Sequence, residues 1–231
     1  MKTIGLLGGM SWESTANYYK AINEGVKAEL GGFHSARIAL YSVDFAEIEV
    51  LQRQGDWQGA AVALSGAARA IESAGAECLL ICTNTMHKVA PVIASAISIP
   101  LLHIADATAE RLKRDNITKV GLLGTAFTME QAFYKGRLEQ KYEIEVIVPD
   151  SIQRGIVHDV IYGELVKGQV NDVSRQRYLE IIEDLQAQGA QAIILGCTEI
   201  AMLVEQKYTT VPLYDTTQIH SEAAVAFALE K

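Results

Sequence analysis

An internal duplication constrains the fold of this 231-residue chain more than any other feature of its sequence. Three segments recur in the same order: residues 5–8 as 121–124, residues 75–83 as 189–197, and residues 99–101 as 211–213. Their spacings of 116, 114 and 112 residues are nearly constant, which chance similarity does not produce in three ordered matches. The sequence therefore predicts two structurally equivalent halves.

Short apolar runs alternate with longer segments of helical periodicity in both halves. The predicted strands are residues 4–7, 36–41, 78–81 and 101–104, followed by 120–123, 145–148, 192–195 and 211–214. The predicted helices are residues 14–30, 56–74 and 88–96, followed by 128–140, 152–167 and 174–188. Apolar strands joined by helices are typical of parallel sheets that are covered on both faces. We therefore predict an α/β fold of two pseudo-symmetric lobes, each a mostly parallel sheet flanked by helices.

The two lobes are expected to pack closely, because no linker rich in proline or serine separates them. The N-terminal lobe is predicted to comprise residues 1–104 plus a returning C-terminal helix at 215–231, and the C-terminal lobe residues 105–214. Ligands of parallel α/β sheets bind at the carboxyl ends of the strands, and pockets are common between lobes. The active site is therefore expected in the cleft between the lobes.

Charge, hydropathy and cysteine content exclude several classes of partner. The net charge of −8 and the lack of a Lys/Arg cluster argue against nucleic acid and anionic membranes as partners. No apolar run reaches the roughly 18 residues of a membrane span, and the N-terminal run is too short for a secretory signal. The odd set Cys78, Cys82 and Cys197 favours a reducing, cytoplasmic location over a disulfide framework. No nearby set of cysteines and histidines completes a metal site around Cys78 and Cys82.

The repeat aligns Thr83 with Cys197, each directly after a predicted buried strand and before a predicted helix. Racemising an amino acid removes the α-proton from one face and returns a proton to the other, so two groups on opposite faces suit that reaction. The helix start after Cys197 is expected to lower the thiol pKa and to offer N–H groups to a substrate carboxylate. The alternative for Cys197 is a small buried core residue, which is also the favoured interpretation of Cys82.

Four blocks together form a specific pattern, and they lie at residues 5–15, 83–87, 102–108 and 196–200. With them the chain resembles the aspartate/glutamate racemase family over nearly its whole length, most closely the bacterial L-aspartate/glutamate-specific racemases. The resemblance implies a homodimeric amino-acid racemase of L-aspartate and/or L-glutamate that needs no pyridoxal phosphate, metal or nucleotide. Most members of that family use two cysteines as paired acid and base, whereas this chain has Thr83 at the first of these positions.

The threonine predicts a directional enzyme. A threonine hydroxyl is a far weaker acid than a thiol and a poor base near neutral pH. We expect Cys197 to take the α-proton from the L-amino acid and Thr83 to assist reprotonation on the far face. D-enantiomers are then expected to react poorly, because they need a base on the Thr83 side.

Substrate-binding candidates follow from the repeat and the resemblance: Met10, Gln52, Asn84, Thr85, Thr125, Thr128, Thr198 and Glu199. Arg53 and Lys167 are candidates for binding the distal carboxylate of the substrate, with a solvated surface role as the alternative for each. Glu199 is expected to orient the substrate ammonium, and His87 to have a structural role beside Thr83.

Two other functions stay open at the level of sequence. The wider superfamily includes decarboxylases and isomerases on the same scaffold, and a member with one pocket cysteine could protonate a single face. A non-catalytic amino-acid-binding protein could instead have kept the cleft and lost the chemistry, with Thr83 as the sign of that loss.

Overall fold

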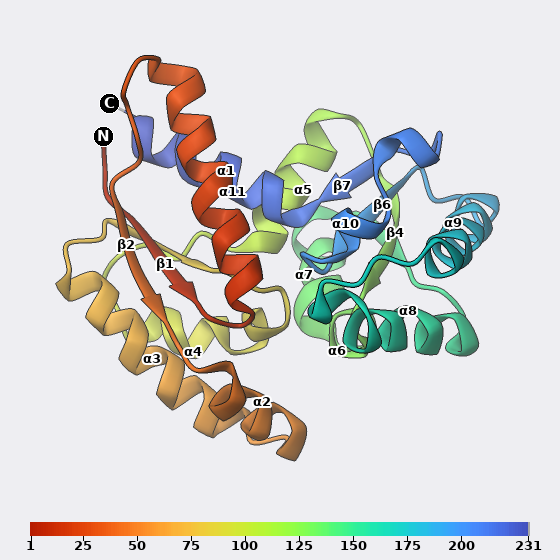
Figure 1. Ribbon diagram of the computed structural model, residues 1–231, viewed down its shortest axis with the longest axis horizontal. Coiled ribbons are helices and arrows are strands. Elements are labelled where there is room, and N and C mark those ends of the chain that lie inside the picture. Colours follow the sequence, from red (N-terminus) through yellow and green to blue (C-terminus); the bar gives the residue numbers. More distant parts are fainter. Residues whose placement is uncertain (231) are drawn as a thin grey trace. The chain divides into compact units, whose positions relative to one another are not determined.

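The computed structural model describes residues 1–230 and divides the chain into two units. The first unit comprises Met1–Ile104 and the chain from Thr217 onward, and the second comprises Ala105–Thr216. Each unit is built on one parallel β-sheet with helices against it (Figure 1). The predicted α/β fold with two mostly parallel sheets is thereby confirmed.

The first unit has a three-stranded sheet of order β2-β1-β3. Its strands are β1 (Ile4–Gly8), β2 (Ile38–Ser42) and β3 (Cys78–Ile81). Its helices are α1 (Trp12–Leu30), α2 (Phe45–Gln54), α3 (Trp57–Ser73), the 3₁₀ helix η1 (Thr85–Val89), α4 (Ala90–Ser95) and α11 (Thr216–Leu229). All residues of β1 and β3 are buried, whereas β2 lies at an edge and is partly exposed.

Both faces of this first sheet are covered, because alternate residues of β1 point to opposite sides. Leu6 packs with Tyr18 of α1 and Ala224 of α11 on one face. Leu7 packs with Leu64 of α3 and with residues of α2, η1 and α4 on the other face. Strands buried on both faces explain why the sequence of this sheet shows continuous apolar runs rather than alternation.

The second unit has a four-stranded sheet of order β5-β4-β6-β7. Its strands are β4 (Lys119–Gly124), β5 (Glu145–Ile147), β6 (Ala192–Gly196) and β7 (Leu213–Asp215). Its helices are α5 (Ile104–Arg114), α6 (Ala126–Glu130), α7 (Ala132–Tyr142), α8 (Ser151–Gly163), η2 (Leu165–Lys167), α9 (Asp172–Ala187), α10 (Ile200–Leu203) and η3 (Gln206–Tyr208). Helices α8, α9 and α10 pack on the face that carries Leu123 and Leu195.

The predicted strand at residues 101–104 is wrong, since only Leu101 joins the sheet, through a single bridge to Leu79. The main-chain N–H of Leu102 still donates to the carbonyl of Leu79 at 2.9 Å. Two residues later Ile104 begins α5, and its N–H donates to the ring of His87 at 3.2 Å instead of extending the ladder. The equivalent segment of the second unit does form the short strand β7.

Three predicted helices are also interrupted. The helix expected at residues 88–96 is divided between the end of η1 at Val89 and α4, which begins at Ala90. The helix expected at residues 128–140 is divided into α6 and α7 by extended backbone at Gln131. The helix expected at residues 152–167 ends at Gly163, and η2 then closes on Gly168 in the left-handed region at φ 71°. None of the helices formed by residues 1–230 is both long and apolar enough to span a membrane.

Candidate active site

The two strand ends that the repeat aligns have the same local burial pattern. Strand β3 and strand β6 are buried throughout, and the first partly exposed residue after them is Thr83 in one unit and Cys197 in the other. The next two residues are buried again in both units: Asn84, Thr85, Thr198 and Glu199. Each unit therefore presents one partly exposed side chain at the carboxyl end of its sheet, directly before two buried polar residues.

The Cys197 thiol is hydrogen-bonded to a carboxylate. Its Sγ donates to Oε2 of Glu199 at 2.9 Å, and the hydroxyl of Thr198 donates to the same oxygen at 2.7 Å. Burial and the negative charge of Glu199 together raise the pKa of the Cys197 thiol well above its ordinary value. At neutral pH, Cys197 is therefore a thiol with a proton acceptor already in contact.

The expected lowering of the Cys197 pKa is therefore wrong. Helix α10 has only four residues and begins at Ile200, so it provides little helix dipole at the sulfur. The backbone N–H groups of Thr198 and Glu199 do favour the thiolate, but burial and the Glu199 carboxylate outweigh them. The signal in the sequence was the acidic residue two positions after the cysteine, whose charge opposes the backbone.

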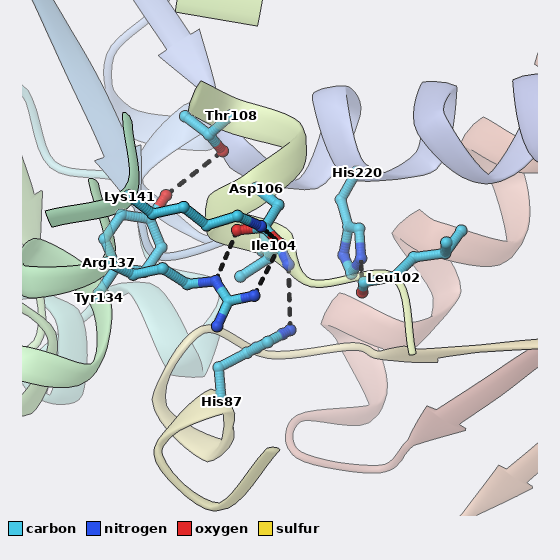
Figure 2. A network of polar contacts seen from close by, with 9 residues as sticks. All are labelled: His87, Leu102, Ile104, Asp106, Thr108, Tyr134, Arg137, Lys141 and His220. Carbon is cyan, nitrogen blue, oxygen red and sulfur yellow. Dashed lines mark hydrogen bonds and ion pairs between the residues drawn. The ribbon is translucent and has the colours of Figure 1, made fainter. Parts of the chain in front are cut away.

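The main chain at Thr83 is held by a histidine. Nδ1–H of His87 donates to the carbonyl of Thr83 at 2.8 Å. Nε2 of the same ring accepts from the N–H of Ile104 at 3.2 Å (Figure 2). Because a carbonyl can only accept and an amide N–H only donate, these partners fix the neutral tautomer of the ring. Burial and the neighbouring His103 and His220 hold the pKa of His87 well below its ordinary value. His87 is therefore uncharged, and its hydrogen bond fixes the main chain at Thr83.

Two further histidines complete this cluster and were missed by sequence reasoning. The ring of His87 lies 4.5 Å from that of His103 and 5.8 Å from that of His220, between centroids. His220 donates to the carbonyl of Leu102 at 2.7 Å and accepts from the hydroxyl of Tyr18 at 2.9 Å. Burial lowers the pKa of His220 to about 4. No local pattern could reveal this contact, since His220 is 118 residues away from Leu102 in the chain.

Buried hydroxyls fix the turn after β1 beside the end of β3. The N–H of Gly9 donates to Oγ1 of Thr15 at 2.8 Å, and the hydroxyl of Ser14 donates to the carbonyl of Cys82 at 3.0 Å. Cys82 itself is fully buried in the core, which raises its thiol pKa. Met10 packs into the opposite core of the same unit and is 5% exposed. Ser14 and Thr15 were not singled out in the sequence, although the N-cap at Ser11 identifies the start of their helix.

The second unit gathers its polar groups at adjacent strand ends, because β4 pairs with β6 up to Gly124 and Gly196. Thr125 follows β4, caps α6 and lies 3.3 Å from Thr128, measured between the hydroxyl oxygens. Both threonines are buried. The turns that carry Thr125 and Cys197 are thus neighbours within one unit.

Comparison with known proteins identifies the family. The profile of the Asp/Glu/hydantoin racemase family matches residues 7–224. This chain belongs to that family. The structure of a candidate Asp/Glu racemase from Yersinia pestis is 57% identical, with 100% of both chains covered and a TM-score of 0.95. An aspartate racemase homologue from Pyrococcus horikoshii OT3 is 33% identical, also with 100% of both chains covered, at a TM-score of 0.88.

A more distant racemase matches part of the chain. The broad specificity amino-acid racemase RacX of Bacillus subtilis is 24% identical over 159 residues, which are 68% of this chain and 66% of RacX. The family membership confirms the resemblance seen in the sequence. The substrate and the catalytic residues of this racemase-family member stay predictions.

The remaining predicted site residues differ in exposure. Gln52 of α2 is 7% exposed. Arg53 is exposed and pairs with Glu49 one turn earlier at 3.7 Å, which favours the surface role for its guanidinium. Lys167 is exposed in η2. Among residues 1–230, no group of three or more His, Cys, Asp and Glu side chains is arranged to hold a metal ion.

Proposed function

We propose that this protein is a cofactor-independent racemase of L-aspartate and/or L-glutamate. In this proposal Cys197 removes the α-proton, and a proton arrives on the opposite face of the substrate from the Thr83 side. Membership of the racemase family supports the reaction class. The observation that carries the assignment of the base is the hydrogen bond from the Cys197 thiol to the Glu199 carboxylate.

The first step uses the thiol–carboxylate pair. Glu199 takes the thiol proton, and the resulting thiolate removes the proton from Cα of the bound L-amino acid. A new S–H bond forms, and the electron pair of the broken C–H bond stays on the substrate as a carbanion. Burial of the sulfur raises the pKa of Cys197 whether or not Glu199 carries the proton, and a thiolate of higher pKa is a stronger base toward carbon.

The second step needs a proton source on the other face. The Thr83 hydroxyl orients a water molecule, which gives one proton to Cα and leaves a hydroxide. The proton on Glu199 then passes to solvent and neutralises that hydroxide, so that the protein returns to its starting state. The contact of His87 with the Thr83 carbonyl supports a fixed main chain at this position.

The substrate carboxylates require local donors, because the protein carries a net charge of −8. Asn84, Thr85 and Thr198 offer amide, hydroxyl and backbone donors next to the two proposed catalytic residues. Gln52 is a better candidate for the distal carboxylate than Arg53, since Gln52 is buried and Arg53 is exposed beside Glu49. The roles of Met10, Thr125, Thr128 and Lys167 in binding stay predictions.

Exchange of the α-proton in deuterated water tests this function. L-aspartate and L-glutamate are expected to exchange and racemise, whereas the D-enantiomers exchange far more slowly. Cys197→Ala should lower the rate of α-proton exchange about 100-fold or more, because it removes the general base. Equal exchange of L- and D-substrates by the native protein would sink the directional mechanism.

The same assay separates the two alternative functions. Release of carbon dioxide from a substituted malonate, without exchange of amino-acid α-protons, would assign a decarboxylase. Calorimetric binding of the amino acids with no exchange of either enantiomer would assign a binding protein. Either result contradicts the racemase proposal.

A further inference from the structure

The pairing of β1 with β3 stops one bond short of where the register of these strands would carry it. The last paired residues are Leu7 and Ile81, and the N–H of Cys82 still donates to the carbonyl of Leu7 at 2.9 Å. In a parallel ladder the next bond would run from the N–H of Gly9 to the carbonyl of Cys82. Both of these groups bond to side chains of α1 instead.

Two consecutive hydroxyls of α1 take the place of that ladder bond. Oγ1 of Thr15 accepts from the N–H of Gly9 at 2.8 Å, and the hydroxyl of Ser14 donates to the carbonyl of Cys82 at 3.0 Å. Ser14 and Thr15 are both buried. A Cβ added at Gly8 would collide with Cγ2 of Thr15, so the first turn of α1 lies directly against the end of β1. Ser14 therefore has a fixed place beside the end of the strand.

The second unit differs at the equivalent strand ends. There the register of β4 and β6 continues to one further pair, Gly124 with Gly196. The main chain before Cys197 is thus held by the ladder itself, whereas the main chain before Thr83 is held by a side chain of a neighbouring helix. The Ser14 contact belongs to the Thr83 side of the repeat.

Side chains hold both peptide groups of Thr83. The carbonyl of Cys82, which accepts from Ser14, belongs to the peptide group before Thr83. The carbonyl of Thr83 belongs to the peptide group after it and accepts from Nδ1–H of His87 at 2.8 Å. Without the Ser14 hydroxyl, the buried carbonyl of Cys82 must turn to find another donor, and the peptide group that carries Thr83 turns with it.

We propose that Ser14 is a positioning residue of the racemase reaction. This role rests on the proposed function, in which a proton reaches the substrate from the Thr83 side. Ser14 acts through the main chain: together with His87 it fixes the peptide groups on either side of Thr83, and so the place of the Thr83 hydroxyl. Because removal of the α-proton by Cys197 does not use this contact, Ser14 serves the second step alone.

Two rates measured together in deuterated water test this role. One is the formation of D-glutamate from L-glutamate, and the other is the incorporation of deuterium into the L-glutamate that remains. A carbanion that is not protonated from the Thr83 side regains a proton from Cys197, and once that thiol has exchanged with the solvent the product is deuterated L-glutamate. The ratio of the two rates therefore reports the second step separately from the first.

Ser14→Ala is expected to form D-glutamate at least about tenfold more slowly, because a small displacement of a reacting group slows its step strongly. Deuterium incorporation into L-glutamate should stay within about twofold of the native rate, because the first step is unchanged. Ser95→Ala is the matched control. The hydroxyl of Ser95 also donates to a carbonyl, that of Val92 at 2.7 Å, but on the exposed surface of α4 in the same unit. This variant should keep both native rates.

If Ser14→Ala does not fold, as judged by circular dichroism, Ser14→Cys decides, because a thiol occupies the place of the hydroxyl but is a weak donor. Its ratio of the two rates should also fall. A native ratio in the folded variant would overturn the role of Ser14, and so would an equal fall of both rates, which is the mark of a merely structural role. A native protein that incorporates no deuterium would contradict the proposed function itself, and the role of Ser14 would fall with it.

Discussion

The carboxylate of Glu199 acts on the Cys197 thiol in two opposite ways. Its negative charge raises the thiol pKa, which lowers the amount of thiolate at neutral pH. The same oxygen lies 2.9 Å from Sγ and offers the shortest path for the thiol proton. A variant that removes the charge but keeps the shape separates the two effects.

In the Glu199→Gln variant, Cys197 is expected to be alkylated faster, and α-proton exchange of the substrate is expected to be slower. Without the negative charge, the pKa of Cys197 falls, more thiolate is present at pH 8, and iodoacetamide reacts several-fold faster at this site. The α-proton exchange of L-glutamate should fall about 100-fold, because the thiol proton loses its acceptor. Peptide mass spectrometry shows which cysteine is alkylated. Cys78 should react slowly, because burial raises its thiol pKa to about 11. Glu205→Gln, an exposed change in the same unit, is the control, and slower alkylation of Glu199→Gln would contradict the assigned role.

Thr83 is expected to set the direction of the reaction. Thr83→Cys supplies a thiol at the equivalent strand end, so a base becomes available for the α-proton of the D-enantiomer. The rate of α-proton exchange of D-glutamate should rise at least tenfold, while exchange of L-glutamate stays within a few-fold of the native rate. Thr83→Ser keeps a hydroxyl and serves as the control. A rise of the same size in Thr83→Ser would mean that space, rather than the thiol, limits the D-substrate.

At the scale of elements, the equivalent glycines of β1 and β4 lie against different kinds of atom in the two units. An alanine Cβ at Gly5 would lie 2.6 Å from the carbonyl oxygen of Cys78, a main-chain atom of the paired strand β3. At the equivalent Gly121, the nearest atom is Cδ1 of Ile193, also at 2.6 Å, and a side-chain end can move away. The same substitution should therefore cost more in the first unit.

Urea unfolding is expected to rank three alanine variants. Gly5→Ala should lower the free energy of unfolding by about 1–3 kcal/mol, and Gly121→Ala by less. Gly66→Ala has no atom within 4 Å of the new Cβ and lies in α3, so it should raise stability by roughly 0.5–1 kcal/mol. If Gly121→Ala is as destabilising as Gly5→Ala, the difference between main-chain and side-chain contact does not control the cost.

Periodicity predicted most elements because their apolar residues are local signals. The buried runs of β1, β3, β4 and β6 could be read directly, and so could the long helices α1, α3 and α9. The failures have non-local causes. Whether residues 101–104 continue a strand depends on the bond between Ile104 and His87, which are 17 positions apart.

The candidate site was predictable to a similar extent. The repeat indicated that Thr83 and Cys197 are equivalent, and both follow buried strands in the structure. The sign of the Cys197 pKa shift was not predictable from the glycine before it, since burial and the direction of the Glu199 side chain decide it. The contacts of His220 with Tyr18 and Leu102 join segments far apart in the chain and left no pattern in the sequence.

At the scale of the whole molecule, the buried histidines link folding to pH. His220 has an ordinary pKa of 6.5 and a pKa of about 4 in the folded protein, because burial disfavours its charged form. Between these two values the unfolded chain binds a proton that the native protein does not. The free energy of unfolding therefore falls as the pH drops from 6.5 toward 4, with no further loss from this group below 4.

This loss is expected to be roughly 3 kcal/mol for His220, at about 1.4 kcal/mol for each unit of pKa difference. Urea unfolding between pH 7.5 and pH 4.5 measures it. His220→Gln should be less stable at pH 7.5, since the bond with Tyr18 changes, but its stability should fall less steeply with acid. His34→Gln is the control, because His34 is exposed in the folded protein. The free energy of unfolding of this variant should fall with acid as steeply as that of the native protein. Equal slopes for the native protein and His220→Gln would show that His220 does not resist protonation in the fold, and the acid sensitivity would then belong to the carboxylates.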